Sequence, residues 1–120
     1  MTTQNEEKEH LHVGIIGMGD MGRLYATRLR AAGWVYVNVC DRPEKYESLR
    51  DELQGTGLTV LRDGHHVSRR SDFIMYSVEA GNIHKVVAEY GPSTKVGSVV
   101  SGQTLSLIHI SERAGKADRQ

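Results

Sequence analysis

The sequence predicts an α/β fold, a doubly wound parallel sheet of about five strands with helices on both faces. Short apolar runs alternate along the chain with stretches whose apolar residues recur three and four positions apart, as in strands followed by amphipathic helices. A glycine-rich turn joins the first such strand to the first such helix. Because parallel strands are joined by right-handed crossovers, we expect strand order 3-2-1-4-5 with the glycine turn at the centre.

The expected elements follow one another in regular alternation. Strands are expected at residues 11–16, 34–40, 58–61, 72–78 and 98–100. Helices are expected at residues 20–32, 44–54 and 82–90, with one helical turn at 63–67. Gly33 and Pro43 support two of these boundaries, because glycine favours a helix C-terminus and proline suits a first helical turn. The nearly continuous apolar run at 72–78 is typical of a parallel strand covered on both faces, so Tyr76 is expected in the core, as is Trp34.

Length and composition limit the chain to one domain. Its 120 residues include 15 basic and 15 acidic side chains, so the formal net charge is zero and no basic stripe indicates nucleic acid. No run of about 18 apolar residues predicts a membrane span. The single cysteine, Cys40, has no partner for an internal disulfide, which favours a reducing, cytoplasmic compartment and a buried, inert thiol. The six histidines show no spacing that predicts a metal site.

Three glycines stand in the spacing G-x-G-x-x-G within residues 13–22, Val-Gly-Ile-Ile-Gly-Met-Gly-Asp-Met-Gly. Between a strand and a helix, this is the dinucleotide-binding signature of Rossmann-like folds. In that signature the first glycine permits the tight turn, the second leaves the backbone open to a pyrophosphate, and the third allows close helix packing. The helix N-terminus then binds the phosphates. The cofactor-binding residues expected here are Gly17, Met18, Gly19, Asp20, Met21 and Gly22. The alternative is a glycine-rich loop without a ligand.

Asp41 and Arg42 stand side by side at the end of the second expected strand. An acidic residue at this place accepts hydrogen bonds from the ribose hydroxyls of NAD, whereas a neighbouring arginine binds the 2′-phosphate of NADP. Arg42 can bind a phosphate bidentately and Lys45 adds charge, so NADP is favoured and NAD is the alternative. An interpretation without a ligand also stays open, in which Asp41 caps the next helix and Arg42 is a solvated surface charge.

Ser77 and Val78 follow the core of the fourth expected strand. Ligands bind beyond the carboxyl ends of parallel strands, so residues 17–22, 41–42 and 77–78 should converge on one crevice. Ser77 and Val78 are therefore candidate cofactor contacts, although a strand-end hydroxyl without such a role is an equal alternative. No G-x-S-x-G motif is present, so hydrolase chemistry is not indicated.

Several further strings accompany the glycine motif. They are Ala-Gly-Trp at 32–34, Cys-Asp-Arg at 40–42, Asp-Gly-His at 63–65, Val-Ser-Arg at 67–69, Tyr-Ser-Val-Glu-Ala at 76–80, Tyr-Gly-Pro-Ser at 90–93 and Ser-Gly-Gln-Thr at 101–104. Together they resemble the fungal-type prephenate dehydrogenases over about residues 13–104. The resemblance implies an NADP-dependent oxidative decarboxylation of prephenate to 4-hydroxyphenylpyruvate, in tyrosine biosynthesis, by a cytoplasmic enzyme that is homodimeric at full length.

The resemblance ends near Thr104. The family continues with a serine and then a lysine, whereas Leu105 follows here. The family's catalytic histidine, substrate-binding arginine and helical second domain lie further on and cannot be placed in this sequence, so no catalytic residue is assigned. We expect a disordered leader at 1–10, an incomplete dinucleotide-binding domain at 11–104 and an irregular tail outside the family at 105–120.

Two other functions stay open at this point. The glycine string alone also resembles the β-hydroxyacid dehydrogenases, such as 3-hydroxyisobutyrate dehydrogenase. A non-catalytic dinucleotide-binding module is the third possibility. For the leading hypothesis, the fragment is expected to bind NADP without oxidising prephenate.

Overall fold

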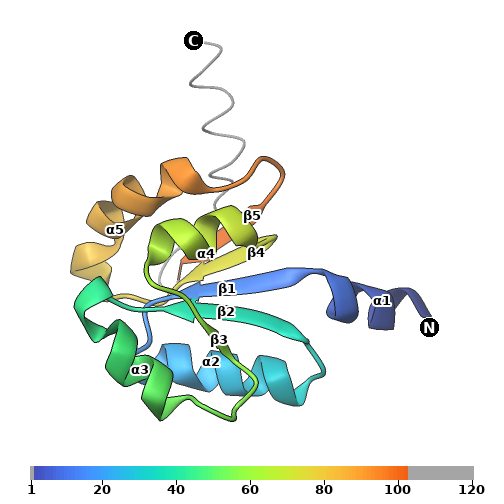
Figure 1. Cartoon of the computed structure of the whole chain (residues 1–120). Coiled ribbons are helices and arrows are strands. Elements are labelled where there is room, and N and C mark those ends of the chain that lie inside the picture. The colour runs from blue at the N-terminus through green and yellow to red at the C-terminus, as the bar shows by residue number, and fades with distance from the viewer. Residues whose placement is uncertain (1, 103–120) are drawn as a thin grey trace.

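The structure is a computed structural model that describes residues 2–102 of the 120-residue chain. Its strands form one sheet in the order β3-β2-β1-β4-β5, and every neighbouring pair is parallel (Figure 1). The predicted strand order and parallel pairing are therefore confirmed. The strands are β1 (His12–Ile16), β2 (Tyr36–Cys40), β3 (Thr59–Val60), β4 (Phe73–Tyr76) and β5 (Val99–Gly102).

Helices cover both faces of the sheet, as the doubly wound fold requires. Figure 1 shows α2 and α3 on one face and α4 and α5 on the other. The helices are α1 (Thr2–His10), α2 (Asp20–Ala31), α3 (Tyr46–Glu52), α4 (Gly64–Arg70) and α5 (Ile83–Tyr90), with short 3-10 helices at η1 (Pro43–Lys45), η2 (Ala80–Asn82) and η3 (Gly91–Ser93). None of the helices within residues 2–102 is long and apolar enough to cross a bilayer.

Within residues 2–102, two apolar clusters form the core, one on each face of the sheet. Ile15 and Ile16 are neighbours in β1, and their side chains point to opposite faces because side chains alternate along a strand. Ile15 belongs to the cluster beside α2 and α3 with Leu49. Ile16 belongs to the cluster beside α4 and α5 with Val67 and Ile83. The central strand thus joins the two halves of the core.

The sequence predicts that Tyr76, Trp34 and Cys40 belong to the core, and all three do. Tyr76 and Cys40 are fully buried in the cluster beside α4 and α5, and Trp34 packs partly buried against the opposite cluster. Burial raises the pKa of the Cys40 thiol well above its ordinary range. This thiol is therefore protonated and inert at neutral pH, because the thiolate is the reactive form.

The carboxyl ends of β1, β2 and β4 lie at the same level. Ile16, the last residue of β1, pairs in register with Cys40 of β2 and with Tyr76 of β4. Just past these ends, the Gly17 amide donates to the Cys40 carbonyl at 2.9 Å, and the Ser77 amide donates to the Ile16 carbonyl at 2.8 Å. The segments that follow the three strands therefore start side by side.

The leader expected to be disordered at residues 1–10 forms helix α1 over Thr2–His10, so that prediction was wrong. The segment is polar, and the hydrogen bonds that hold the end of its helix go to residues distant in sequence, so composition did not predict them. The Lys8 ammonium donates to the Ala32 carbonyl at 2.8 Å, and the Val35 amide donates to the Lys8 carbonyl at 3.0 Å. Both bonds join α1 to the connection between α2 and β2, which is distant in sequence. The tail expected at 105–120 lies outside the described residues.

Two other helices differ from expectation in length. The turn expected at 63–67 extends to seven residues in α4, and the single helix expected at 44–54 divides into η1 and α3. Asp63 is the N-cap of α4, and its carboxylate accepts the His66 amide at 3.1 Å. The cap satisfies one of the amides that a helix start leaves without an intrahelical partner.

The first prediction concerns two glycines of the turn. A Cβ at Gly22 would overlap the backbone oxygen of Gly17, whereas a Cβ at Gly19 would meet no atom within 4 Å. We expect Gly22→Ala to lower the free energy of unfolding by about 1–3 kcal/mol, because the helix must move away from the turn. Gly19→Ala should cost at most about 1 kcal/mol, through the weaker helix-capping preference of alanine. Urea unfolding of both variants measures this, and equal losses would contradict it.

The second prediction concerns the cap of α4. Although burial opposes ionisation, hydrogen bonds from the ring and the amide of His66 lower the pKa of Asp63 below its ordinary value. A carboxylate whose pKa is lowered by folding stabilises the fold above its unfolded pKa of about 3.9, and this stabilisation is lost as the pH falls through the folded pKa. Asp63→Ala should therefore cost about 0.5–2 kcal/mol at neutral pH.

The same unfolding measurements repeated in acid complete the test of the cap. The difference between wild type and Asp63→Ala should shrink below a pH of about 4. Asp63→Asn is the matched control, because its amide oxygen still accepts the His66 amide and should retain most of the stability. A difference that stays constant into strong acid would exclude the carboxylate as its source.

Candidate functional site

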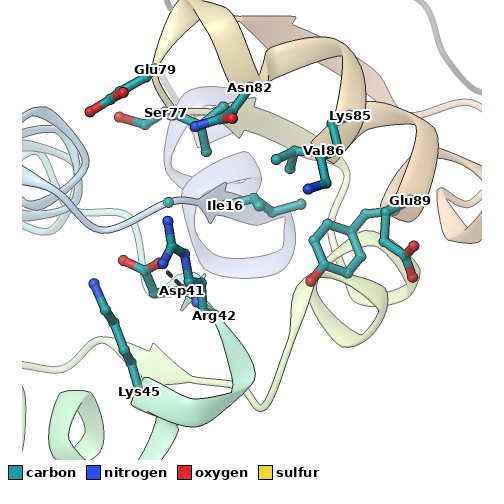
Figure 2. A pocket seen from close by; sticks show the side chains of 13 residues that line it. Ile16, Asp41, Arg42, Lys45, Ser77, Glu79, Asn82, Lys85, Val86 and Glu89 are labelled. Carbon is teal, nitrogen blue, oxygen red and sulfur yellow. Dashed lines mark hydrogen bonds between the residues drawn. The ribbon is translucent and has the colours of Figure 1, made fainter.

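A cavity of about 670 Å³ opens at the carboxyl ends of β1, β2 and β4. Its walls include segments that follow all three strands, together with the side of α5 that faces them (Figure 2). The volume lies within the range of about 300–1,000 Å³ that is usual for small-molecule sites. This is the edge at which parallel α/β sheets bind ligands.

The convergence predicted from the three strand ends is observed. Residues of the expected set that line the cavity are Gly17, Asp41, Arg42, Ser77 and Val78. The other five, Met18, Gly19, Asp20, Met21 and Gly22, continue from this wall into the start of α2 but do not line the cavity.

The three glycines of the motif occupy different surroundings. Gly17 has φ +105°, and a Cβ there would overlap the carbonyl group of Ser77. Gly22 lies against the Gly17 carbonyl, so the start of α2 packs directly on the turn. Gly19 borders open space and is the N-cap of α2, where no side chain provides a capping hydrogen bond. A phosphate can approach the backbone at Gly19, and the first amides of the helix are the groups that bind such an anion.

Met18 is 1% exposed and belongs to the core beside α2 and α3, so its side chain is closed to a ligand. The carboxylate of Asp20 lies in the first turn of α2, where a negative charge is favourable to the helix dipole. The Met21 side chain is 39% exposed.

Asp41 holds the glycine turn through its carboxylate. Its Oδ2 accepts the Met18 amide at 3.0 Å, and its Oδ1 accepts the Arg42 amide at 2.8 Å. The sequence left open that Asp41 caps the next helix, but the residue at that N-cap is Arg42, without a side-chain capping bond. Since each carboxylate oxygen has two acceptor positions, Asp41 can hold the turn and still accept a ligand hydroxyl.

The cavity carries charges of both signs. Arg42 and Lys45 come from the β2 side, and Figure 2 shows them across the cavity from Lys85, which comes from α5. Carboxylates of Glu79 and Glu89 lie on the α5 side with Lys85. The two cations near Asp41 form the part of the wall that suits an anionic group.

The wall formed by α5 was missed by sequence reasoning. It contributes Lys85, Val86, Glu89 and Tyr90, and Asn82, the last residue of η2, lines the cavity just before it. The spacing of Asn82, Val86 and Glu89, four and then three residues apart, is that of one helix face and was the signal available. Because α5 starts shortly after Ser77 and Val78, this face of the helix lies beside them at the cavity.

The ring of His65 lies behind this wall. Its Nδ1 is 2.7 Å from the Ser93 hydroxyl, its Nε2 is 3.0 Å from the Glu89 carboxylate, and its ring meets that of Tyr90 edge to face. Within residues 2–102, no group of three or more His, Cys, Asp or Glu side chains is placed to hold a metal ion.

A family model described as "NADP oxidoreductase coenzyme F420-dependent" matches residues 12–102, which include every described strand and the whole wall of the cavity. The chain belongs to this family. The matched range ends at Gly102, the last residue of β5.

Two curated fungal proteins that are similar to this chain are both named as prephenate dehydrogenases. This chain is 64% identical over 97 residues to the "Probable prephenate dehydrogenase [NADP(+)]" of Schizosaccharomyces pombe. It is 53% identical over 92 residues to the "Prephenate dehydrogenase [NADP(+)]" of Saccharomyces cerevisiae. These alignments cover 81% and 77% of this chain but 22% and 20% of the relatives, so the chain spans about a fifth of their length.

Solved structures share the fold at low sequence identity. An imine reductase from Myxococcus stipitatus in complex with NADP+ matches with a TM-score of 0.65 and 18% identity, over 91% of this chain and 37% of that one. A pyrroline carboxylate reductase from Plasmodium falciparum with NADP bound matches with a TM-score of 0.63 and 18% identity, over 78% of this chain and 33% of the other. These similarities establish the Rossmann-like fold of this NADP oxidoreductase family member.

Proposed function

We propose that this chain binds NADP in the cavity at the carboxyl ends of β1, β2 and β4, as the cofactor-binding part of a prephenate dehydrogenase. The observation that carries the proposal is the glycine turn, in which Gly19 borders open space at the uncapped start of α2 while Arg42 lines the adjoining cavity. The names of the two fungal relatives support both the cofactor and the activity. They favour prephenate dehydrogenase over a β-hydroxyacid dehydrogenase.

The residues present fit a dinucleotide phosphate. The pyrophosphate would lie at the N-terminus of α2, where the amides following Gly19 and the helix dipole favour negative charge. Adenosine would lie in the cavity beside Arg42, where the apolar side chains of Val78 and Val86 also line it. Ser77 and Asp41 would supply polar contacts at the strand ends. When bound, NADP supplies the acceptor for a hydride.

Preference for NADP over NAD would come from charge beside the ribose. Arg42 and Lys45 line the same part of the cavity and are the cations nearest in sequence to Asp41. A guanidinium bonded to a phosphate forms charge-assisted, often bidentate hydrogen bonds. Asp41 accepts the Met18 and Arg42 amides, and its carboxylate oxygens keep further acceptor positions for a ribose hydroxyl.

For the whole enzyme we propose oxidative decarboxylation of prephenate to 4-hydroxyphenylpyruvate, in the cytoplasm, by a homodimer. The fungal relatives support the reaction, the single buried Cys40 is consistent with a reducing compartment, and the family resemblance supports the dimer. Residues 11–104 are proposed as the dinucleotide-binding part. No described residue is assigned a catalytic role toward prephenate.

The third prediction tests the 2′-phosphate contact. Arg42→Ala should weaken NADP binding by about ten- to a hundredfold, because a charge-assisted hydrogen bond is worth about 1.5–3 kcal/mol. NAD binding should change little. Arg69→Ala, which removes an exposed arginine of α4 that does not line the cavity, is the matched control. Calorimetric titration of both cofactors decides the matter, and equal losses for NADP and NAD would refute the assignment of Arg42.

The fourth prediction separates binding from turnover. The 120-residue chain should bind NADP but not reduce it when prephenate is added, because the family resemblance places the groups that stabilise the transition state beyond Thr104. Acid–base assistance alone typically contributes a factor of about 10²–10⁴. Fluorescence of the reduced cofactor and chromatography of 4-hydroxyphenylpyruvate provide the readouts. Prephenate-dependent reduction that Gly19→Val abolishes would show that this chain carries the chemistry itself.

A further inference from the structure

We propose that Arg23 and Glu52 are positioning residues, which together orient the glycine turn so that its amides face the cofactor's pyrophosphate. The inference rests on the proposed function and adds to it two residues that do not line the cavity. Arg23 lies in the first turns of α2, and Glu52 is the last residue of α3. The two helices lie on the same face of the sheet (Figure 1).

Two successive peptide groups of the turn are held by side chains from elsewhere in the fold. The amide of the Gly17–Met18 peptide donates to Asp41 Oδ2 at 3.0 Å. The carbonyl of the Met18–Gly19 peptide accepts a hydrogen bond from Arg23 Nη1. The backbone on either side of Met18 is therefore fixed in direction, by a carboxylate on one peptide and by a guanidinium on the next.

The planarity of the peptide carries this restraint to the phosphate site. In a trans peptide the C=O and the N–H of the following residue point in opposite directions. The bond from Arg23 to the Met18 carbonyl therefore turns the Gly19 N–H away from Arg23. Gly19 is the N-cap of α2 and borders open space, so its amide belongs to the set that would bind an anion.

Glu52 fixes the guanidinium that makes this bond. Arg23 Nε donates to Glu52 Oε2 at 2.8 Å, and Arg23 Nη2 donates to Glu52 Oε1 at 2.7 Å. This bidentate arrangement sets the plane of the guanidinium and thereby the direction of Nη1. The hydrogen bonds from Arg23 hold the pKa of Glu52 below its ordinary value, so the carboxylate is charged at neutral pH.

Exposure indicates that the pair serves the turn more than the global fold. The Arg23 and Glu52 side chains are 39% and 48% exposed. Exposed ion pairs contribute little to the free energy of unfolding. Holding a ligand-binding backbone in its bound orientation, by contrast, reduces the entropy that binding must otherwise overcome. Loss of the pair should therefore change binding more than stability.

The test compares two ligands that share the adenosine 2′-phosphate. NADP has a pyrophosphate, whereas 2′-AMP has none and cannot contact the glycine turn through it. We expect Arg23→Gln and Glu52→Gln each to weaken NADP binding by about three- to tenfold and to leave 2′-AMP binding unchanged. Calorimetric titration of the 120-residue chain measures both affinities, and thermal unfolding verifies that the variants remain folded.

Two further variants make the test specific. Lys95→Gln removes the same charge and breaks a partly exposed ion pair of 2.7 Å with Asp72, which precedes β4 at the amino ends of the strands, so both affinities should stay at the wild-type level. Arg23→Lys retains the charge but lacks the planar fork. It should therefore behave like Arg23→Gln, and full NADP affinity in Arg23→Lys would overturn the inference.

The remaining outcomes separate this inference from the proposed function. If Glu52→Gln binds NADP as tightly as wild type or more tightly, Arg23 does not act through Glu52, and the inference fails. If NADP and 2′-AMP lose affinity equally, the pair acts on the whole domain and the inference also fails. If the wild-type chain binds neither ligand, the proposed function itself fails.

Discussion

The structure depends on the close approach of two backbones at the first strand–helix junction. The turn after β1 brings the Gly17 carbonyl against Gly22, and no side chain can occupy either place without displacing backbone. This approach starts α2 directly at the end of the central strand. The apolar cluster on this face of the sheet packs against α2. The position of that half of the core therefore depends on a contact between two glycines, which have no side chains.

The proposed pyrophosphate site is built from backbone amides, and the side chains around it hold that backbone in place. Asp41 accepts the amide of Met18 and Arg23 donates to the carbonyl of Met18, while Arg23 is itself held by Glu52. The charged side chains of Asp41, Arg23 and Glu52 therefore stabilise the conformation of the glycine turn. Arg42 bonds to Asp41 through its backbone amide, and its side chain lines the cavity.

Sequence patterns were sufficient for the architecture. Alternating apolar runs and helical periodicities predicted the parallel sheet and its strand order, because right-handed crossovers leave few ways to connect such elements. Strand ends at Gly17, Asp41 and Ser77 predicted the convergence on one crevice, because parallel strands with level registers end at the same edge. These are local rules of backbone geometry, and they act on residues that are close in sequence.

Tertiary structure alone decided what contacts these elements make. The polar segment Thr2–His10 shows no apolar periodicity, and its helix is joined to the fold by bonds to Ala32 and Val35. The Met18 amide that bonds to Asp41 lies 23 residues away, and the Glu52 carboxylate that bonds to Arg23 lies 29 residues away, so neither of these bonds could be deduced from spacing. By itself the sequence determined a Rossmann-like sheet with a glycine turn at its centre. Which side chains hold that turn was decided by packing, because such hydrogen bonds form only after helices and strands distant in sequence have been brought together.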